Sequence, residues 1–293
     1  MSDTQAAAQT HQETRPGDGR LSGAARAVSE WWGWLTETIG GPARRGVLVL
    51  LAVAALLAGA VWEALHPANW RRRTVRAELR RTLRQALAGS LGTVLITGML
   101  VGFGMVYQAL TWLSFAGQEG FSGSVLVTVL LREVAPLVTG LILLGRSGTV
   151  TVVEFGEIKA AGQLRLLEAQ GIDPIQLLVL PRTVAFSVAG FALGVIFVAT
   201  ALATGFVVAD MFNRVQGSSA EFLNYLLSAT DKRDFVLFPA KLVLIGALVA
   251  LVSALTGFSS TPQEKPAHLL PRGFVRGTLA VLVSSVLLTL AVA

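Results

Sequence analysis

The chain has 293 residues, of which 53% are hydrophobic and 14% are charged, and its mean hydropathy is +0.63. Soluble domains carry about 25% charged residues, so this composition excludes an ordinary soluble domain and indicates a polytopic membrane protein. The lack of cysteine excludes disulfides and Cys-ligated metal sites, and the three histidines are too dispersed for a metal motif. The net charge of +6 comes from basic residues beside apolar segments, which indicates contact with anionic headgroups rather than nucleic acid.

The N-terminal part is predicted to lie at the membrane surface. Residues 1–29 are polar and lack an apolar core, so they are expected to be a disordered cytoplasmic tail and not a signal peptide. Residues 30–84 are expected to hold interfacial helices and a basic anchor on anionic lipid. Tryptophans favour a surface helix at Glu30–Ile39, and arginines mark Trp70–Arg84 as the anchor. For Val47–Trp62, a shallow or re-entrant helix and a full span both remain open.

The remaining chain predicts an all-α fold with five membrane spans. The expected spans are Ala86–Phe115, Ser124–Val150, Val184–Ala209, Phe235–Phe258 and a shorter Gly277–Ala293. Pro136 should loosen or kink the second span because proline removes a backbone donor. The segments Asp210–Asp234 and Ser259–Arg276 are expected to be connecting loops.

Three charged residues lie well inside the predicted spans, away from their ends. Arg132 and Glu133 are adjacent in the second span, and Lys241 is in the fourth. Ionisable groups in a membrane are costly, so each is expected to have a partner or a function. A structural lock between helices and direct contact with substrate both remain open. We expect Glu133 and Lys241 to lie at similar depth and to form a salt bridge.

An amphipathic segment separates the second and third spans. Glu154–Gln170 has apolar residues at helical spacing and polar residues on the other face, which predicts one surface helix. Gly171 is a natural helix stop, and Asp173 followed by Pro174 predicts the start of a new helix, so an elbow is expected here. A passive surface connector would give the same pattern.

The distribution of basic residues predicts the orientation of the chain. The basic segments fall on one side if the spans alternate; they are Arg71–Arg84, Arg146–Arg182 and Lys265–Arg276. The positive-inside rule therefore places the N-terminus and the amphipathic segment in the cytoplasm, and the C-terminus on the outer face.

The sequence contains no GxxxxGK[ST] phosphate loop, no HExxH and no GxSxG motif, so an enzyme is not expected. A stand-alone secondary transporter or channel that uses Arg132, Glu133 and Lys241 as an ion relay is the alternative from another class. The absence of an evident inverted repeat disfavours this alternative.

Several longer motifs carry a resemblance to a known family. They are GFGMVYQ at 102–108, LLREVAP at 130–136, GRSGTVTVVEFGEIKAAGQLRLLEAQGIDP at 145–174, LVLPR at 178–182 and PRGFVRGTLAVLVSS at 271–285. Together they resemble the MlaE (YrbE) type of ABC transporter permease, with residues 85–293 as the permease domain.

The resemblance implies a function and partners. Such permeases move phospholipids or related lipids between the bacterial inner membrane and the outer envelope. They have an N-terminal interfacial helix, five spans and a cytoplasmic coupling helix. They work as dimers with a separate pair of ATPase subunits, which bind ATP and Mg, and with a ring of MCE-domain proteins outside. No cofactor or metal is expected in this chain.

The resemblance also implies site residues. The residues expected to couple to the ATPase are Glu154, Gly156, Lys159, Gln163, Arg165, Glu168, Asp173 and Pro174. The residues expected to line the substrate cavity are Gly98, Gly102, Tyr107, Gln108, Leu137 and Leu141. Gly162 and Arg165 stand where the family commonly has acidic residues. This difference suggests either one half of a heterodimeric permease or a divergent ATPase, and a homodimer remains open.

Overall fold

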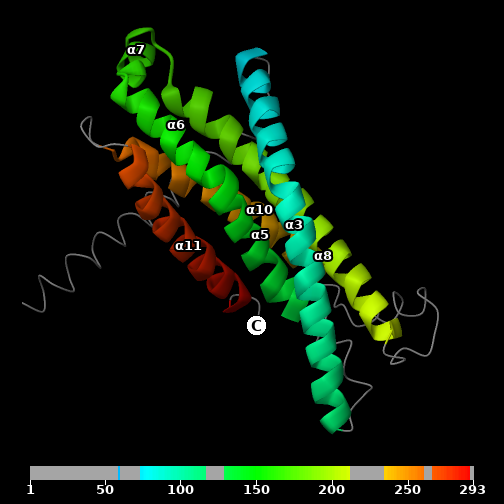
Figure 1. The fold of residues 1–293 in the computed structure, drawn as a ribbon. Helices are drawn as coiled ribbons and strands as arrows, with labels where there is room; N and C mark the ends of the chain where they lie inside the picture. The colour runs from blue at the N-terminus through cyan, green and yellow to red at the C-terminus, as the bar shows by residue number, and fades with distance from the viewer. Residues whose placement is uncertain (1–58, 60–72, 117–128, 212–233, 261–265, 291–293) are drawn as a thin grey trace, which may run out of the picture. The chain divides into compact units, whose positions relative to one another are not determined.

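The computed structural model describes residues 59, 73–116, 129–211, 234–260 and 266–290, and every regular element in these ranges is helical (Figure 1). Five helical stretches are long and apolar enough to cross a membrane, as the sequence predicts. They are Thr74–Met105, Leu130–Ala160, Ile175–Val208, Phe235–Phe258 and His268–Leu290. The predictions for the tail at 1–29, the interfacial helices up to residue 72 and most of the 210–234 connection lie outside the described residues.

The first membrane helix, α3 (Arg73–Ala116), begins earlier than predicted. The basic anchor is not a separate surface segment, because its residues from Arg73 to Arg84 are the first part of this continuous helix. No glycine or proline interrupts the sequence from Arg73 to Ala86, so nothing ends the helix there. Val75 and Ala86 are buried, whereas Arg80 and Arg84 are exposed on the other side of α3.

The second membrane helix contains two wide turns. In chain order it consists of η4 (Leu130–Val134), α5 (Ala135–Leu143), η5 (Leu144–Gly148) and α6 (Thr149–Ala160), where η marks a π-helical turn. The predicted end at Val150 is wrong, because the helix continues to Ala160. Pro136 lies in the first turn of α5, so the expected loosening takes the form of the π turn that precedes it.

The single helix predicted for Glu154–Gln170 is also wrong. α6 ends at Ala160, and a separate short helix, α7 (Gln163–Ala169), follows it. Gly162, between the two helices, has φ +71°, a left-handed conformation that side chains disfavour. The segment therefore turns at Gly162 and does not run on as one amphipathic helix.

The predicted elbow after α7 is confirmed. Gly171 has φ +72°, its N–H donates to the carbonyl of Glu168, and the N–H of Ile172 donates to that of Leu167. This is the Schellman pattern that ends a helix. The Asp173 carboxylate then accepts a hydrogen bond of 2.8 Å from the Ile175 N–H, which caps the next helix.

Three further helices complete the described fold. The helix α8 (Leu180–Met211) follows the π turn η6 (Ile175–Val179), and α10 (Asp234–Phe258) and α11 (Pro266–Leu290) come after it. The loop predicted for Ser259–Arg276 is wrong in its second half, because α11 begins at Pro266. The fifth span is consequently longer than predicted at its N-terminal side.

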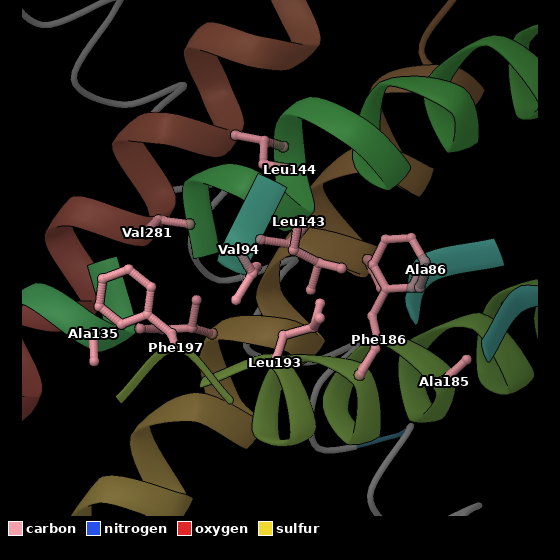
Figure 2. Packing of buried hydrophobic residues seen from close by; sticks show 14 of the residues in the cluster. Ala86, Val94, Ala135, Leu143, Leu144, Ala185, Phe186, Leu193, Phe197 and Val281 are labelled. Carbon is pink, nitrogen blue, oxygen red and sulfur yellow. The ribbon is translucent and has the colours of Figure 1, made fainter. Parts of the chain in front are cut away.

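The helices pack through a core of alanine, leucine and phenylalanine side chains (Figure 2). Phe186, Leu193 and Phe197 of α8 lie at its centre, with Leu143 and Leu144 of the second helix beside them. α8 contacts both α3 and α10, and α10 contacts α6 and α11. α8 therefore joins the first and fourth spans.

Glycines allow the backbones to approach closely at α8. A Cβ at Gly102 of α3 would lie 2.2 Å from the carbonyl oxygen of Ala201, and a Cβ at Gly246 of α10 would lie 2.3 Å from that of Phe186. Neither place has room for a side chain. Small residues at helix contacts are the usual device for close packing in a membrane.

Candidate functional site

A first ionic cluster joins the second, fourth and fifth spans. It consists of Glu133, Lys241, Ser285 and Thr289, and we call it the Lys241 cluster. Lys241 Nζ lies 3.2 Å from Glu133 Oε1 and donates a 2.8 Å hydrogen bond to Thr289 Oγ1. Thr289 in turn donates a 2.6 Å bond to Glu133 Oε1. The predicted salt bridge between Glu133 and Lys241 is confirmed.

Lys241 also donates to the backbone carbonyl of Arg132. This carbonyl would normally accept from the residue four positions later, which is Pro136 and has no N–H. The lysine thus satisfies a polar group that the proline leaves without its usual donor, and this links the ion pair to the π turn η4. The side chain of Arg132 itself is exposed.

A second ionic cluster joins the second span to α3 and α8. It consists of Arg182, Glu78, Glu154 and Phe155, and we call it the Arg182 cluster. Arg182 Nη2 lies 3.3 Å from Glu78 Oε1 and forms a closer ion pair with Glu154. Its guanidinium also lies over the ring of Phe155, 4.4 Å from the centroid. Only 8% of the Arg182 side chain is exposed, so these contacts are shielded from solvent.

The Arg182 cluster lies near the end of the second span that carries α7. Phe155 stacks on Phe258 of α10 with centroids 4.7 Å apart, and Lys159 donates to the Phe258 carbonyl. Glu154 is 21 residues from Glu133, about 32 Å along a helix. The two clusters therefore bind the bundle together at two well-separated depths.

Sequence reasoning missed Arg182 and Glu78. Arg182 was seen only as the last residue of a motif, and Glu78 is the one acidic residue among the arginines of Trp70–Arg84. That isolation was a usable signal, because an acid in a basic segment indicates a specific partner. The partner itself lies 104 residues away, which no local pattern reveals.

The predicted coupling residues fall into two groups. Four of them are exposed on α7 or the elbow; they are Gln163, Arg165, Glu168 and Asp173. Glu154 is instead paired with Arg182, and Gly156 is buried, where a Cβ would lie 2.9 Å from Leu269. Lys159 and Pro174 are half-buried. The structure therefore places the accessible members of the set on α7 and the elbow.

The predicted cavity residues also separate. Gly98 and Gly102 are buried against α8, so α8 fills the space beside them. Tyr107 and Gln108 are exposed on α3, and Leu137 and Leu141 are half-buried in α5. In the part of the chain that the structure describes, no group of three or more acidic or histidine residues is positioned to hold a metal ion.

Comparison with known proteins agrees with this architecture. The family model described as Permease MlaE matches residues 79–291. The intermembrane phospholipid transport system permease protein MlaE of Haemophilus influenzae is 27% identical over 202 residues, which cover 68% of this chain and 77% of that protein.

Two further relatives come from photosynthetic organisms. A probable ABC transporter permease protein of Synechocystis is 28% identical over 65% of this chain and 73% of its own length. The chloroplastic protein TRIGALACTOSYLDIACYLGLYCEROL 1 of Arabidopsis thaliana is 27% identical over 60% of this chain, and the match spans half of that protein.

Proposed function

Because this chain belongs to the MlaE permease family, we propose that it is the membrane-spanning subunit of an ABC transporter that moves phospholipids. The family match over residues 79–291 carries this conclusion, and the relative from Haemophilus influenzae is a phospholipid transport permease by name. The five apolar helices make the chain a multi-pass membrane protein, and we place it in a bacterial inner membrane.

The energy source in this proposal is a separate ATPase. The sequence has no phosphate loop of its own, so ATP and Mg would be bound by partner subunits. α7 is the natural contact for them, because it is short, exposed and flanked by Gly162 and Gly171. Basic residues cluster near this end of the bundle, which supports a cytoplasmic position for α7 and for the N-terminus, with the C-terminus outside.

The Arg182 cluster supports a route from α7 into the membrane. A short helix between two glycine turns would move alone if nothing joined its two arms. Arg182 joins them, because it ties the beginning of α8 to Glu154 on α6 and to Glu78 on α3. A displacement of α7 would therefore move α3, α6 and α8 together.

We further propose that the permease works as a dimer beneath a ring of MCE-domain proteins. Exposed apolar side chains along α3, α8 and α11 support extensive contact with lipid or a second subunit. Whether that subunit is identical decides between the homodimer and the heterodimer, and subunit masses of the purified assembly distinguish them.

The stand-alone ion transporter is not favoured. Its proposed relay residues Glu133 and Lys241 pair with each other, and hydroxyl groups satisfy their remaining contacts. A pair whose polar groups are bound to one another fits a lock between helices better than a group that exchanges ions with solvent.

The test is reconstitution of the chain with its ATPase in liposomes that contain a fluorescent phospholipid. We expect lipid transfer that requires ATP and stops when the ATPase carries a substitution that abolishes hydrolysis. Transfer by the permease alone along an ion gradient, with no dependence on ATP, would contradict the proposal and support the transporter alternative.

A further inference from the structure

Arg146 lies inside every possible crossing segment of the second membrane helix, as far as the structure describes that helix. The apolar stretch Leu130–Ala160 has 31 residues, whereas about 20 are enough to cross the hydrocarbon core. Every stretch of about that length, from 130–149 to 141–160, contains residue 146. The Cα atom of Arg146 is therefore at the depth of the acyl chains.

The side chain of Arg146 is nevertheless exposed. Its Nε donates a 2.9 Å hydrogen bond to the carbonyl of Gly89 on α3. A carbonyl is neutral and does not balance the charge of a guanidinium. Among the described residues, no carboxylate forms a salt bridge with Arg146. A cation at this depth without a counter-charge is costly and indicates a functional group.

The local helix geometry accounts for the exposure of the Arg146 side chain. Arg146 is at the centre of the π turn η5, in which Leu144, Ser147 and Gly148 are buried while Gly145 and Arg146 are exposed. π turns place an additional residue in a helix and often mark functional positions. The turn therefore presents the arginine at the surface of the bundle, beside α3.

The surface beside Arg146 is open. A Cβ added at Gly89 or at Gly92 of α3 would meet no atom within 4 Å, and one at Gly145 would meet only Phe274, at 3.8 Å. Glycine at these positions leaves room for a polar group next to the guanidinium.

An apolar stripe begins at the same place. Ile96, Leu100, Phe103 and Tyr107 follow Gly89 on one face of α3 at helical spacing, and all four are exposed, with Leu100 66% exposed. The stripe runs from Gly89 for about 27 Å toward the end of the bundle opposite α7. The stripe is an apolar surface whose first residue, Gly89, is bound to the positively charged side chain of Arg146.

We propose that Arg146 binds the phosphate of a phospholipid whose acyl chains lie along this stripe of α3. The inference rests on the proposed function and names the substrate contact within it. Planar guanidinium groups bind phosphate oxygens through two parallel hydrogen bonds. Nε is bound to Gly89, and the terminal nitrogens of this exposed side chain would supply those bonds.

The test measures how well the purified full-length chain discriminates two lipids with identical acyl chains. Phosphatidylglycerol carries the phosphate, and diacylglycerol lacks it. Bound lipid is counted by native mass spectrometry after titration in detergent. We expect the unaltered chain to prefer phosphatidylglycerol and Arg146→Gln to lose roughly tenfold of that preference, because hydrogen bonds to a charged group are lost. Arg146→Lys, which keeps the charge without the planar fork, should lose less.

The matched control is Arg272→Gln, which removes an exposed arginine from α11, a helix that carries no part of the α3 stripe. We expect it to leave the preference unchanged. An unchanged preference for phosphatidylglycerol in Arg146→Gln would overturn the proposal. If Arg146→Gln does not fold, an unchanged preference in Arg146→Lys overturns it.

The binding assay separates this inference from the proposed function. If the reconstituted assembly transfers no phospholipid while the preference still depends on Arg146, the phosphate site stands and the transport proposal fails. If ATP-driven transfer occurs in both the unaltered chain and Arg146→Gln at equal rates and with equal preference, the transport proposal stands and the phosphate site fails.

Discussion

Glu133 and Lys241 are 108 residues apart in the sequence and 3.2 Å apart in the structure, where they join the second and fourth membrane helices. Thr289 contacts both groups from the fifth helix. In a bilayer this arrangement lowers the cost of both charges, because each has a counter-charge and a hydroxyl partner. The cluster is a fixed connection among three helices.

Removal of one member of this pair should destabilise the protein. We expect Lys241→Met to lower the free energy of unfolding by roughly 1–3 kcal/mol, because Glu133 and the Arg132 carbonyl both lose a charged donor. Thermal unfolding in detergent measures the effect. The double variant Glu133→Gln with Lys241→Met should lose less than the sum of the two single variants. Strict additivity would show that the two residues do not interact.

The ion pair between Arg182 and Glu154 leads to a prediction about energy coupling. We expect Arg182→Met to raise the number of ATP molecules hydrolysed per lipid transferred, because α6 and α8 would no longer move together. The measurement is ATP hydrolysis and lipid transfer in the same reconstituted assembly. Glu154→Gln should act in the same direction and more weakly, since Glu78 and Phe155 still contact the arginine.

Glu157→Gln is the matched control for this prediction, because Glu157 is exposed on the same helix one turn away from Glu154. It should leave the ratio of ATP to lipid unchanged. If Arg182→Met and Glu157→Gln give the same ratio as the unaltered chain, the Arg182 cluster has no part in coupling.

The sequence predicts the helices better than it predicts their ends. Apolar length alone identifies all five spans, because the cost of backbone polar groups in lipid leaves few other structures for such segments. The boundaries at Val150 and at Arg276 were wrong, since charged residues do not stop a helix that packs against neighbours. The turn at Gly162 was missed, because Glu154–Gln170 was predicted as one helix, whereas the positive φ of this glycine makes a turn.

The contacts in the two ionic clusters could also be predicted only in part from the sequence. The pairing of Glu133 with Lys241 was predictable, because few charges occur inside the spans and they must satisfy one another. The Arg182 cluster was not predictable, since its residues come from the ends of helices that the sequence assigned to surface segments. The roles of Gly98 and Gly102 depend on which helix lies opposite, and only the tertiary structure places α8 there.

The stability of α7 should depend on the residue type at the glycine turns that flank it, because both glycines have positive φ. We expect Gly171→Val to weaken the end of α7 by about 1–2 kcal/mol, because a side chain disfavours the left-handed conformation. Gly171→Asn should cost less, since asparagine tolerates that conformation. Hydrogen exchange of the α7 amides measures local opening. Equal protection in both variants would show that the positive φ does not determine the stability of this helix.

Gly246 of α10 provides the sharpest test of the helix packing. A Cβ here would lie 2.3 Å from the Phe186 carbonyl oxygen, so Gly246→Ala should force α8 and α10 apart. We expect a loss of about 1–3 kcal/mol, the usual cost of inserting atoms into a packed interface. The melting temperature of the purified chain in detergent measures it.

Gly104→Ala is the matched control for Gly246→Ala, because a Cβ at this helical position of α3 meets no atom within 4 Å. Here the substitution should be neutral or stabilising by up to about 1 kcal/mol, since alanine is the better helix former. Equal melting temperatures for the two variants would mean that α8 and α10 do not approach as closely as the structure has them. A lower value for Gly246→Ala alone ties the loss to the contact with Phe186.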